Sequence, residues 1–324
     1  MLIRVTAKKI IIDCDPGIDD ALAIVLAHGS PELEIVGITT VGGNVGLEHT
    51  TANALKLREF LGLHGVPVTA GSAGPLLRAR VDAAEVHGDS GLGAARLPEP
   101  RLRAAPGHAV DFIIDAIAAD PGEITLVAIG PLTNVALAVR KEPKLAEMVR
   151  ELVILGGSYT RGNFTPAAEF NIAADPEAAA IVFEAGWTVT TIGLDAAKHA
   201  LATGWVVEEM RAMGRLGADL LVPCVEFYGL ATAADGPAIY DACAVAHVID
   251  PTLHVFAPAE VNVETVGRWT YGMTVTDFDV RPGRANARVA TSLDVARFWD
   301  LVLPAYREAA ARMGAAETTA EPAP

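Results

Sequence analysis

Cysteine is scarce in this chain of 324 residues: it occurs three times, at Cys14, Cys224 and Cys243, and never with CxxC spacing. All three lie in apolar stretches, so neither a disulfide framework nor a cysteine-based zinc site is expected. Positive charge is also in short supply, because 25 lysines and arginines face 40 aspartates and glutamates, for a net charge of −15. Such an excess repels polyanions, so neither nucleic acid nor an anionic membrane is expected as a partner.

Long apolar runs are absent as well. No stretch of 18 apolar residues appears, which argues against a transmembrane helix. The N-terminal stretch MLIRVTAKK leads directly into a predicted strand and lacks the apolar core of a signal peptide. Together with the few cysteines, these absences predict a cytoplasmic protein in a reducing compartment.

Short apolar runs, in contrast, are frequent, and the chain is 51% hydrophobic. Several runs are continuously apolar, as in strands that are covered on both faces. The predicted strands are residues 9–14, 34–41, 66–70, 124–129, 151–155, 187–194 and 270–276. The predicted helices are residues 18–28, 47–61, 108–119, 133–140, 176–186, 241–249 and 294–312. This alternation predicts an α/β fold, with a mainly parallel, Rossmann-like open sheet flanked by helices.

The pattern also predicts the domain organisation. Residues 1–313 are predicted to form a single domain. Residues 314–324 are small, polar and proline-containing, and are predicted to be a disordered tail. Within the domain, Asp175-Pro176-Glu177 is typical of a helix start, with Asp as N-cap, Pro at the first helical position and Glu in the first turn.

Four carboxylates fall within eight residues in the stretch IIIDCDPGIDD, at the end of the first predicted strand. Asp13 and Asp15 share one face of the strand, while Asp19 and Asp20 fall in the first turn of the next helix. The carboxyl ends of parallel strands are where ligands bind. Because four like charges repel strongly in a pocket of low dielectric, a hard cation such as calcium, which takes six to eight oxygen ligands, is the economical explanation.

Two other interpretations fit this stretch. Asp19 and Asp20 could merely complement the helix dipole, while Asp13 and Asp15 accept hydrogen bonds from loop amides. A strand that ends in Asp-x-Asp also resembles the start of the haloacid-dehalogenase-like phosphatases, whose first aspartate is a nucleophile. That family expects threonine or valine where this chain has Gly17, and a downstream acidic pair after a lysine that is not evident here.

The stretch is more similar to the signature of the inosine-uridine nucleoside hydrolases. The blocks that resemble this family, in order, are DCDPGIDDALAI (13–24), TTVGGN (39–44), HGDSGLG (87–93), IGPLTN (129–134), AEFNIAADPE (168–177), DACAVA (241–246) and WTYGMT (269–274). Together they span nearly the whole chain, and ordered blocks are far more specific than one motif. The resemblance implies the nucleoside hydrolase fold, with one catalytic domain. It further implies calcium-dependent splitting of the N-glycosidic bond of a ribonucleoside into free base and ribose, in nucleoside salvage.

The resemblance also implies roles for individual residues. Ca²⁺ would be bound by the carboxylates of Asp15, Asp20 and Asp241 and by the backbone carbonyl of Ile129. Asp15 would also be the general base toward the metal-bound water, and Asp13 would support the site from behind. The implied substrate contacts are Asp19, Asn44, Asn163, Glu169, Phe170, Asn171 and Tyr228. The implied partners are a small-molecule nucleoside and copies of the same chain, in a homodimer or homotetramer.

These residue types suit the chemistry, because hydrogen bonds to the sugar hydroxyls can strengthen as an oxocarbenium-like transition state forms. Calcium holds the diol and the water together and makes the water more acidic. Taken singly, however, Asn44 could be only a turn residue, Glu169 and Asn171 could cap the helix after Asp175, and His87 could be an ordinary loop residue.

One position departs from the family pattern. Many purine-processing and nonspecific members carry histidine before the last metal-binding aspartate, as the proposed acid that protonates the leaving base, whereas this chain has Tyr240. Tyrosine holds its proton at neutral pH but is a weaker acid than imidazolium. His87, Tyr228 or Tyr240 could therefore supply the proton to the leaving base, or the enzyme could depend mainly on activation of the sugar. No preference for purines or pyrimidines can be transferred across this substitution. Tyr228 lies in residues 224–234, a predicted helical stretch that in relatives belongs to a mobile flap over the base.

The same substitution leaves a rival interpretation open. The chain could be a nucleoside- or ribose-binding protein that keeps the calcium and sugar site but has weak or no turnover. The intact base and metal ligands favour catalysis, because binding alone would not require them.

Overall fold

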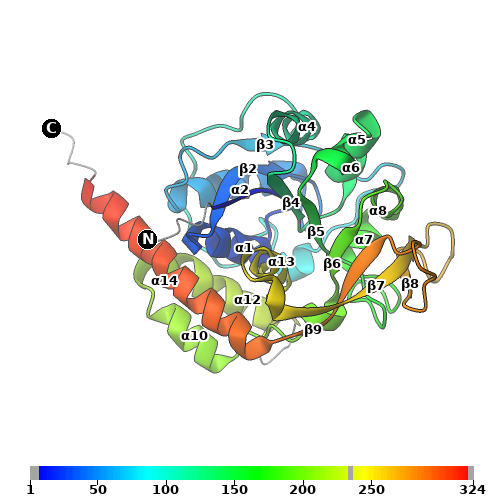
Figure 1. Cartoon of the computed structure of the whole chain (residues 1–324). Helices are drawn as coiled ribbons and strands as arrows, with labels where there is room; N and C mark the ends of the chain where they lie inside the picture. The colour runs from blue at the N-terminus through cyan, green and yellow to red at the C-terminus, as the bar shows by residue number, and fades with distance from the viewer. Residues whose placement is uncertain (1–6, 233–235, 320–324) are drawn as a thin grey trace, which may run out of the picture.

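The fold is built around a nine-stranded sheet with the order β3-β2-β1-β4-β5-β6-β9-β7-β8 (Figure 1). The computed structural model describes residues 7–232 and 236–319. The strands are β1 (Lys8–Cys14), β2 (Leu33–Thr40), β3 (Val68–Ala70), β4 (Ile124–Ala128), β5 (Glu151–Leu155), β6 (Val189–Ile192), β7 (His254–Val263), β8 (Thr274–Asp277) and β9 (Ala287–Leu293). Seven neighbouring strands, from β3 to β9 in this order, run parallel, whereas β7 and β8 are added antiparallel. The predicted α/β fold with a mainly parallel sheet is confirmed.

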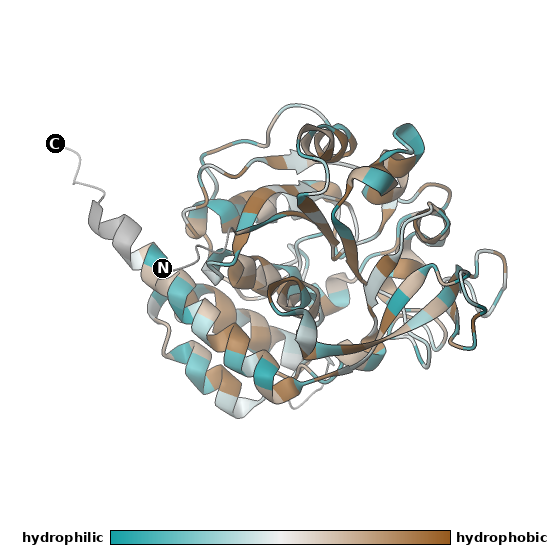
Figure 2. Ribbon diagram, in the orientation of Figure 1, coloured by the Kyte–Doolittle hydropathy of each residue, from teal (hydrophilic) through white to brown (hydrophobic). Residues whose placement is uncertain are grey.

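The sheet is the middle layer, because its side chains feed two separate cores. In β1, Ile10 and Ile12 belong to one core cluster and Ile11 to the other, and none of the three is exposed. Successive side chains of a strand point to opposite faces, so a strand covered on both faces is apolar throughout. Figure 2 shows the same apolar colouring along the central strands.

Helices cover both faces. The helices that contribute to the core of Ile10 and Ile12 are α1 (Ile18–Gly29), α2 (Leu47–Phe60), α10 (Gly204–Arg211), α12 (Val222–Thr232), α13 (Tyr240–Ile249) and α14 (Val295–Thr319). Those of the other core are α4 (Ala109–Ala119), α5 (Thr133–Lys141), α6 (Leu145–Met148) and α8 (Pro176–Phe183). The short elements are α3 (Ala84–His87), α7 (Phe170–Ala174), α9 (Leu194–Ala197), α11 (Gly214–Leu216), a π-helix (Gly217–Leu221) and a 3-10 helix (Pro251–Leu253). Among the described residues, no helix is both long and apolar enough to cross a membrane.

The predicted elements differ from the observed ones mainly after residue 186. Strands β7 and β9 were not predicted, because both are partly exposed and interrupt their apolar positions with polar ones. The strand predicted over residues 270–276 lies instead at Thr274–Asp277, and Leu194 begins α9 rather than ending β6.

The C-terminal predictions also need correction. Helix α14 runs to Thr319, so the predicted tail begins with helix, which its alanines favour; residues 320–324 lie outside the described residues. The helical stretch predicted over residues 224–234, in contrast, is confirmed as far as Thr232, and its last two residues lie outside the described part.

The connections between strands create a site at the carboxyl ends of the central strands β1, β2 and β4. Strand β1 pairs with β2 on one side and with β4 on the other, so the chain moves away from β1 in both directions. At such a switch point the loops after adjacent strands diverge and leave a crevice. The loops that follow β1, β2 and β4 carry Asp15, Asn44 and Ile129 into this region.

Candidate active site

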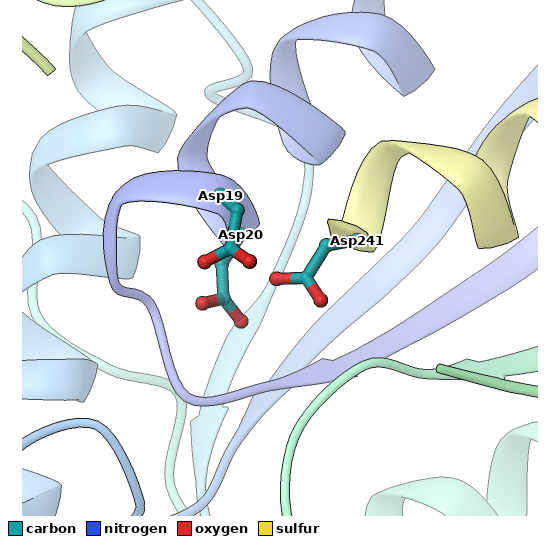
Figure 3. Close-up of side chains that lie close together, drawn as sticks. All are labelled: Asp19, Asp20 and Asp241. Atoms are coloured by element: carbon teal, nitrogen blue, oxygen red, sulfur yellow. The ribbon is translucent and has the colours of Figure 1, made fainter. Parts of the chain in front are cut away.

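Three buried carboxylates from two distant parts of the chain meet at the carboxyl edge of the sheet. Asp19 and Asp20 come from the first turn of α1, and Asp241 from the first turn of α13. One oxygen of each lies within 4.8 Å of the others, and Figure 3 shows the side chains converging. The packing of α1 against α13 therefore assembles this acidic cluster.

Asp15 lies beside the cluster in a cradle made by two glycines. An added Cβ at Gly43 would lie 2.1 Å from its Oδ2, and one at Gly130 would lie 2.5 Å from its Oδ1. The backbone N–H of Asn44 donates to Oδ2 at 2.6 Å. The other oxygen, Oδ1, is buried and has no hydrogen-bond partner. An unpaired carboxylate oxygen at this depth is costly unless a cation or water satisfies it.

Asp20 is held by backbone and side-chain amides. The N–H groups of Gly17 and Asp15 donate to it at 2.9 and 3.1 Å, and the Nδ2 of Asn44 donates at 3.1 Å. The hydrogen bond from Gly17, the N-cap residue, makes Asp20 part of the capping box at the start of α1. The hydrogen bonds do not remove the repulsion among the neighbouring carboxylates, however.

Asp13 lies behind the cluster, at the end of β1. Its Oδ1 accepts hydrogen bonds from Thr39 Oγ1 at 2.6 Å and from Asn134 Nδ2 at 2.9 Å. Asn134 also donates to the carbonyl of Thr40, so it links β1 and β2. The sequence blocks contain Asn134, but a lone asparagine in a loop gives no signal of such a role.

Burial and mutual repulsion disfavour the charged forms of these groups. Burial, followed by the neighbouring carboxylates, raises the pKa values of Asp15, Asp19 and Asp241 well above their usual range. Burial raises the pKa of Asp13 and of Asp20 to about 6 each, against the opposing effect of their hydrogen bonds. A cation would reverse these shifts.

The residues present fit a hard divalent metal ion. All ligand atoms on offer are oxygens, four carboxylates lie close together, and one oxygen of Asp15 and one of Asp13 behind it are buried without a hydrogen-bond partner. Oxygen-only sites suit calcium or magnesium rather than softer metals. Ile129, the predicted carbonyl ligand, lines the cavity beside this cluster. Its carbonyl accepts a hydrogen bond from Asn171 Nδ2 at 2.9 Å.

A cavity of about 200 Å³ opens next to this cluster. The predicted site residues that line it are Asp19, Asn44, His87, Ile129, Asn163, Glu169, Phe170, Asn171, Tyr228, Tyr240 and Asp241. Asp15 and Asp20 are not among the lining residues. The lining residues that were not predicted are Ala83, Val86, Leu155, Phe164, Leu194 and Thr232. Of these, only Phe164 carried a signal, as a lone aromatic in the polar loop RGNFTP next to Asn163.

The polar groups on one wall are neutral hydrogen-bond donors. The N–H of Ile18 donates to His87 Nδ1 at 3.0 Å, which leaves the ring proton on Nε2. Burial lowers the pKa of His87 to about 4 and raises that of Tyr240 to about 12. Burial also raises the pKa of Tyr228, whose ring lies 5.6 Å from that of His87. At neutral pH these three side chains keep their protons without net charge.

Glu169 also lines the cavity and caps a helix. Its carboxylate accepts hydrogen bonds from the N–H groups of Asn171, Ile172 and Gly157 at 2.9, 3.1 and 3.0 Å. The capped helix is α7, not the helix after Asp175, so the capping interpretation was correct in kind but assigned the wrong helix. The predicted N-cap of α8, Asp175, is confirmed by its bond to the N–H of Ala178.

The family model of inosine-uridine preferring nucleoside hydrolases matches residues 10–300. The chain belongs to this family. A nucleoside hydrolase of the same description from Leishmania major is 46% identical over 92% of this chain and 97% of its own length. The non-specific ribonucleoside hydrolase RihC of Escherichia coli (strain SE11) is 44% identical over 89% of this chain and 95% of its own. The structure of a purine-preferring ribonucleoside hydrolase from Gardnerella vaginalis matches with a TM-score of 0.89 at 35% identity, over 94% of this chain and 99% of that one.

Membership of the nucleoside hydrolase family confirms the predicted resemblance and the prediction of an enzyme that hydrolyses ribonucleosides. It excludes the phosphatase interpretation of the aspartate stretch. The roles of the individual site residues stay predictions.

Proposed function

We propose that this nucleoside hydrolase cleaves the N-glycosidic bond of ribonucleosides with calcium as its metal ion, releasing free base and ribose. One observation carries this proposal: a cavity lined by amide, carboxylate and aromatic side chains adjoins four buried carboxylates, one of which has an unpaired oxygen. The arrangement provides oxygen ligands for a metal, acceptors for a sugar and donors for a leaving base.

The residues that would hold calcium are Asp15, Asp20 and Asp241, with the carbonyl of Ile129. When bound, calcium would orient the ribose diol and a water molecule and would make that water more acidic. Asp19 lies in the same cluster but also lines the cavity, which suits it to accept a hydrogen bond from a ribose hydroxyl.

Asp15 is the proposed general base. Its Oδ2 is occupied by the N–H of Asn44, so Oδ1 is the oxygen that would take a proton from the attacking water. The glycine cradle fixes this carboxylate in place. As the bond to the base breaks, the ring oxygen and C1′ share a positive charge, and the surrounding carboxylates favour that charge electrostatically.

The leaving base would be assisted by hydrogen bonds. His87 donates through Nε2–H, and Tyr228 and Tyr240 through their hydroxyls. The low pKa of His87 argues against an imidazolium acid, which was one of the candidates from the sequence. Departure of the base would therefore depend on hydrogen bonding and on activation of the sugar.

A substrate panel tests the proposal. Release of reducing ribose would be measured from inosine, adenosine, guanosine, uridine, cytidine and a nitrophenyl riboside, with and without a calcium chelator. Chelator-sensitive release, restored by calcium, is the expected outcome. Calorimetric binding of nucleosides without release of ribose would instead support the binding-protein interpretation.

The predicted cytoplasmic location and the predicted homodimer or homotetramer are part of this proposal and rest on the sequence alone. Light scattering coupled to gel filtration would decide the assembly state. The prediction of one catalytic domain over residues 1–313 can be tested by limited proteolysis.

A further inference from the structure

Asn53 is a buried polar residue in the middle of α2, and its side chain is only 3% exposed. Its neighbours in the sequence, Ala52 and Ala54, are good helix formers, whereas asparagine is a poor one. A polar side chain at this depth is expected to be held by hydrogen bonds. The reason for an asparagine at this position therefore lies in the groups that its amide contacts.

The amide of Asn53 joins two loops of the active site. Its Nδ2 donates hydrogen bonds to the carbonyl of Pro16 at 2.9 Å and to the carbonyl of Ser90 at 2.6 Å. Pro16 belongs to the loop between β1 and α1, and Ser90 to the loop after α3. The amide nitrogen carries two N–H donors, so it can serve two carbonyls at once, which a single hydroxyl cannot.

In the first loop, the bond from Asn53 fixes a peptide group that also holds Asp20. The carbonyl of Pro16 and the N–H of Gly17 belong to the same planar peptide unit. That N–H donates to Asp20 Oδ2 at 2.9 Å. The carboxylate of Asp20 points from the start of α1 toward Asp241 (Figure 3). A rotation of this peptide would therefore withdraw a hydrogen bond from a proposed calcium ligand.

In the second loop, the bond from Asn53 restrains the segment that carries His87. The N–H of Gly93 donates to the carbonyl of His87 at 2.8 Å, which closes residues 87–93 into a tight loop. Ser90 lies inside this closed loop, so a hydrogen bond to its carbonyl also limits the movement of the His87 backbone. The position of His87 therefore depends on the amide of Asn53.

Gly91 shows how closely the two loops approach each other beside this amide. Its φ of 92° lies in the left-handed region that favours glycine. An added Cβ would lie 2.9 Å from Asn53 Nδ2 and 3.2 Å from the carbonyl oxygen of Pro16. A side chain at residue 91 would therefore displace the amide from its two acceptors.

A direct hydrogen bond also connects the two loops. The N–H of Ile18 donates to His87 Nδ1 at 3.0 Å, which leaves the Nε2 proton for the leaving base. Ile18 follows Gly17 directly, so the peptide group held by Asn53 is adjacent to the N–H that orients the imidazole. His87 and Asp20 are thus both oriented by the same short stretch of backbone.

We propose that Asn53 is a positioning residue that couples the metal site to the donor for the leaving base. By holding both loops, it keeps Asp20 placed for calcium and His87 placed for the base, an inference that rests on the proposed function. Asn53 does not line the cavity, so it acts only through these loops. Partners that orient a metal ligand from behind typically change metal affinity or activity about 10-fold to 100-fold when they are lost.

Asn53→Leu tests the proposal, because it keeps the volume of the side chain and removes both donors. The dissociation constant for calcium, measured by titration calorimetry, should rise about tenfold. The ratio of kcat/KM for the best nucleoside of the substrate panel to that for a nitrophenyl riboside, at saturating calcium, should fall about tenfold, because only the nucleoside needs a donor at its base. A change in only one of these two quantities would overturn the coupling.

Asn286→Leu is the matched control. The Nδ2 of Asn286 also donates to two carbonyls, those of Phe183 in α8 and Val261 in β7, at 3.1 and 2.9 Å. Asn286 does not line the cavity, so its replacement should leave both the calcium dissociation constant and the substrate ratio at their wild-type values. Equal changes in Asn53→Leu and Asn286→Leu would reflect a general loosening of the fold and would overturn the proposal.

Asn53→Ser is a milder variant that keeps one donor, and it decides the question if Asn53→Leu does not unfold cooperatively. Because one hydroxyl can serve only one of the two carbonyls, both quantities should shift in the same directions by a smaller factor. Wild-type values of both quantities in Asn53→Ser would overturn the proposal.

Hydrogen–deuterium exchange separates this inference from the proposed function, because it needs neither calcium nor substrate. In Asn53→Leu, the backbone amides of residues 15–20 and of residues 87–93 should both exchange about tenfold faster than in the wild type, while the rest of the chain is unchanged. If the wild type neither binds calcium nor cleaves a riboside, the proposed function fails, and faster exchange in both segments still supports the coupling of the loops. Wild-type exchange in either segment would overturn it.

Discussion

At the scale of single residues, the site depends on how Asp15 is placed. Gly43 and Gly130 leave room for its carboxylate, and the N–H of Asn44 orients one oxygen. The second oxygen is buried without a partner. A side chain in this environment is suited to taking up a proton or contacting a cation, and contributes little as a structural hydrogen-bond acceptor.

Replacing Asp15 with asparagine tests its proposed role as the base. The amide keeps the shape but cannot accept the proton, so kcat should fall by about 10²-fold to 10⁴-fold. The melting temperature should stay the same or rise, because a buried charge is removed. The variant would be compared with Asp89→Asn, which alters an exposed carboxylate. Near-normal turnover would rule out Asp15 as the base.

Tyr240→Phe tests hydrogen bonding to the leaving base. Loss of the hydroxyl should slow hydrolysis of ordinary nucleosides by about 10-fold to 100-fold, as for a hydrogen bond to a group that gains charge. A nitrophenyl riboside should be slowed much less. If both substrate classes are slowed equally in steady-state kinetics, the tyrosine positions the substrate instead.

At the scale of elements, the site is held together where helices begin. Asp20 caps α1, Glu169 caps α7 and Asp175 caps α8. Asp175 does more than cap, because its Oδ2 also accepts hydrogen bonds from Thr133 Oγ1 at 2.6 Å and from the N–H of Leu76 at 3.0 Å. It thus joins α5, α8 and the loop that leads to α3.

Asp175→Ala should therefore lower the free energy of unfolding by about 2–4 kcal/mol, which combines a lost helix cap with two polar groups left without their acceptor. Denaturation by urea would measure the change. Asp115→Ala, which removes an exposed carboxylate from α4, serves as the control and should change stability by less than about 0.5 kcal/mol. A loss no larger than that of the control would show that the cap contributes little.

At the scale of the whole molecule, metal binding and folding are linked. The proposed ligands come from α1, α13 and the loops after β1 and β4, which are far apart in the sequence, so the complete site exists only in the folded chain. Calcium should raise the melting temperature. A free calcium concentration of 100 times the dissociation constant should raise the free energy of unfolding by about 2.7 kcal/mol. Differential scanning fluorimetry would show the gain, its loss with a chelator, and its loss in Asp241→Asn. The same gain in Asp241→Asn as in Asp89→Asn would contradict the site.

Protonation of the buried His254 should oppose folding as the pH falls. Burial, with a contribution from the nearby His247, lowers the pKa of His254 to about 4, and both of its ring nitrogens are buried without a partner. The unfolded chain, with a histidine pKa near 6.5, binds the proton more readily. The contribution of the neutral His254 to the free energy of unfolding is thus fully present above about pH 6.5 and is lost as the pH falls toward 4.

His254→Leu should remove part of this dependence. Between pH 7.5 and 4.5 the free energy of unfolding of the wild type should fall by about 2–3 kcal/mol more than that of the variant. This follows from a difference of about 2.5 between the pKa of His254 in the folded and in the unfolded chain. Urea denaturation at the two pH values measures it, with Val255→Leu as a control at the exposed neighbouring position in β7. If the stability of His254→Leu and of the wild type changes equally with pH, His254 is not a source of the pH dependence.

The sequence by itself determined the six parallel strands from β1 to β6 and the acidic stretch. Runs such as Ile10 to Ile12 are apolar because both faces of the strand are covered, and that pattern is local. It did not predict β7 and β9, because both strands are partly exposed and polar residues interrupt their apolar positions, so neither contains a continuous apolar run. It also placed a disordered tail where α14 continues.

Only the tertiary structure decided which residues meet. The packing of α1 against α13 brings Asp241 to Asp19 and Asp20 across more than two hundred residues of sequence. The cradle around Asp15 and the neutral form of His87 depend on distances between loops from different strands. Composition and motif order fix the type of residue available, whereas desolvation and hydrogen-bond partners, which set its chemistry, arise only when the chain has folded.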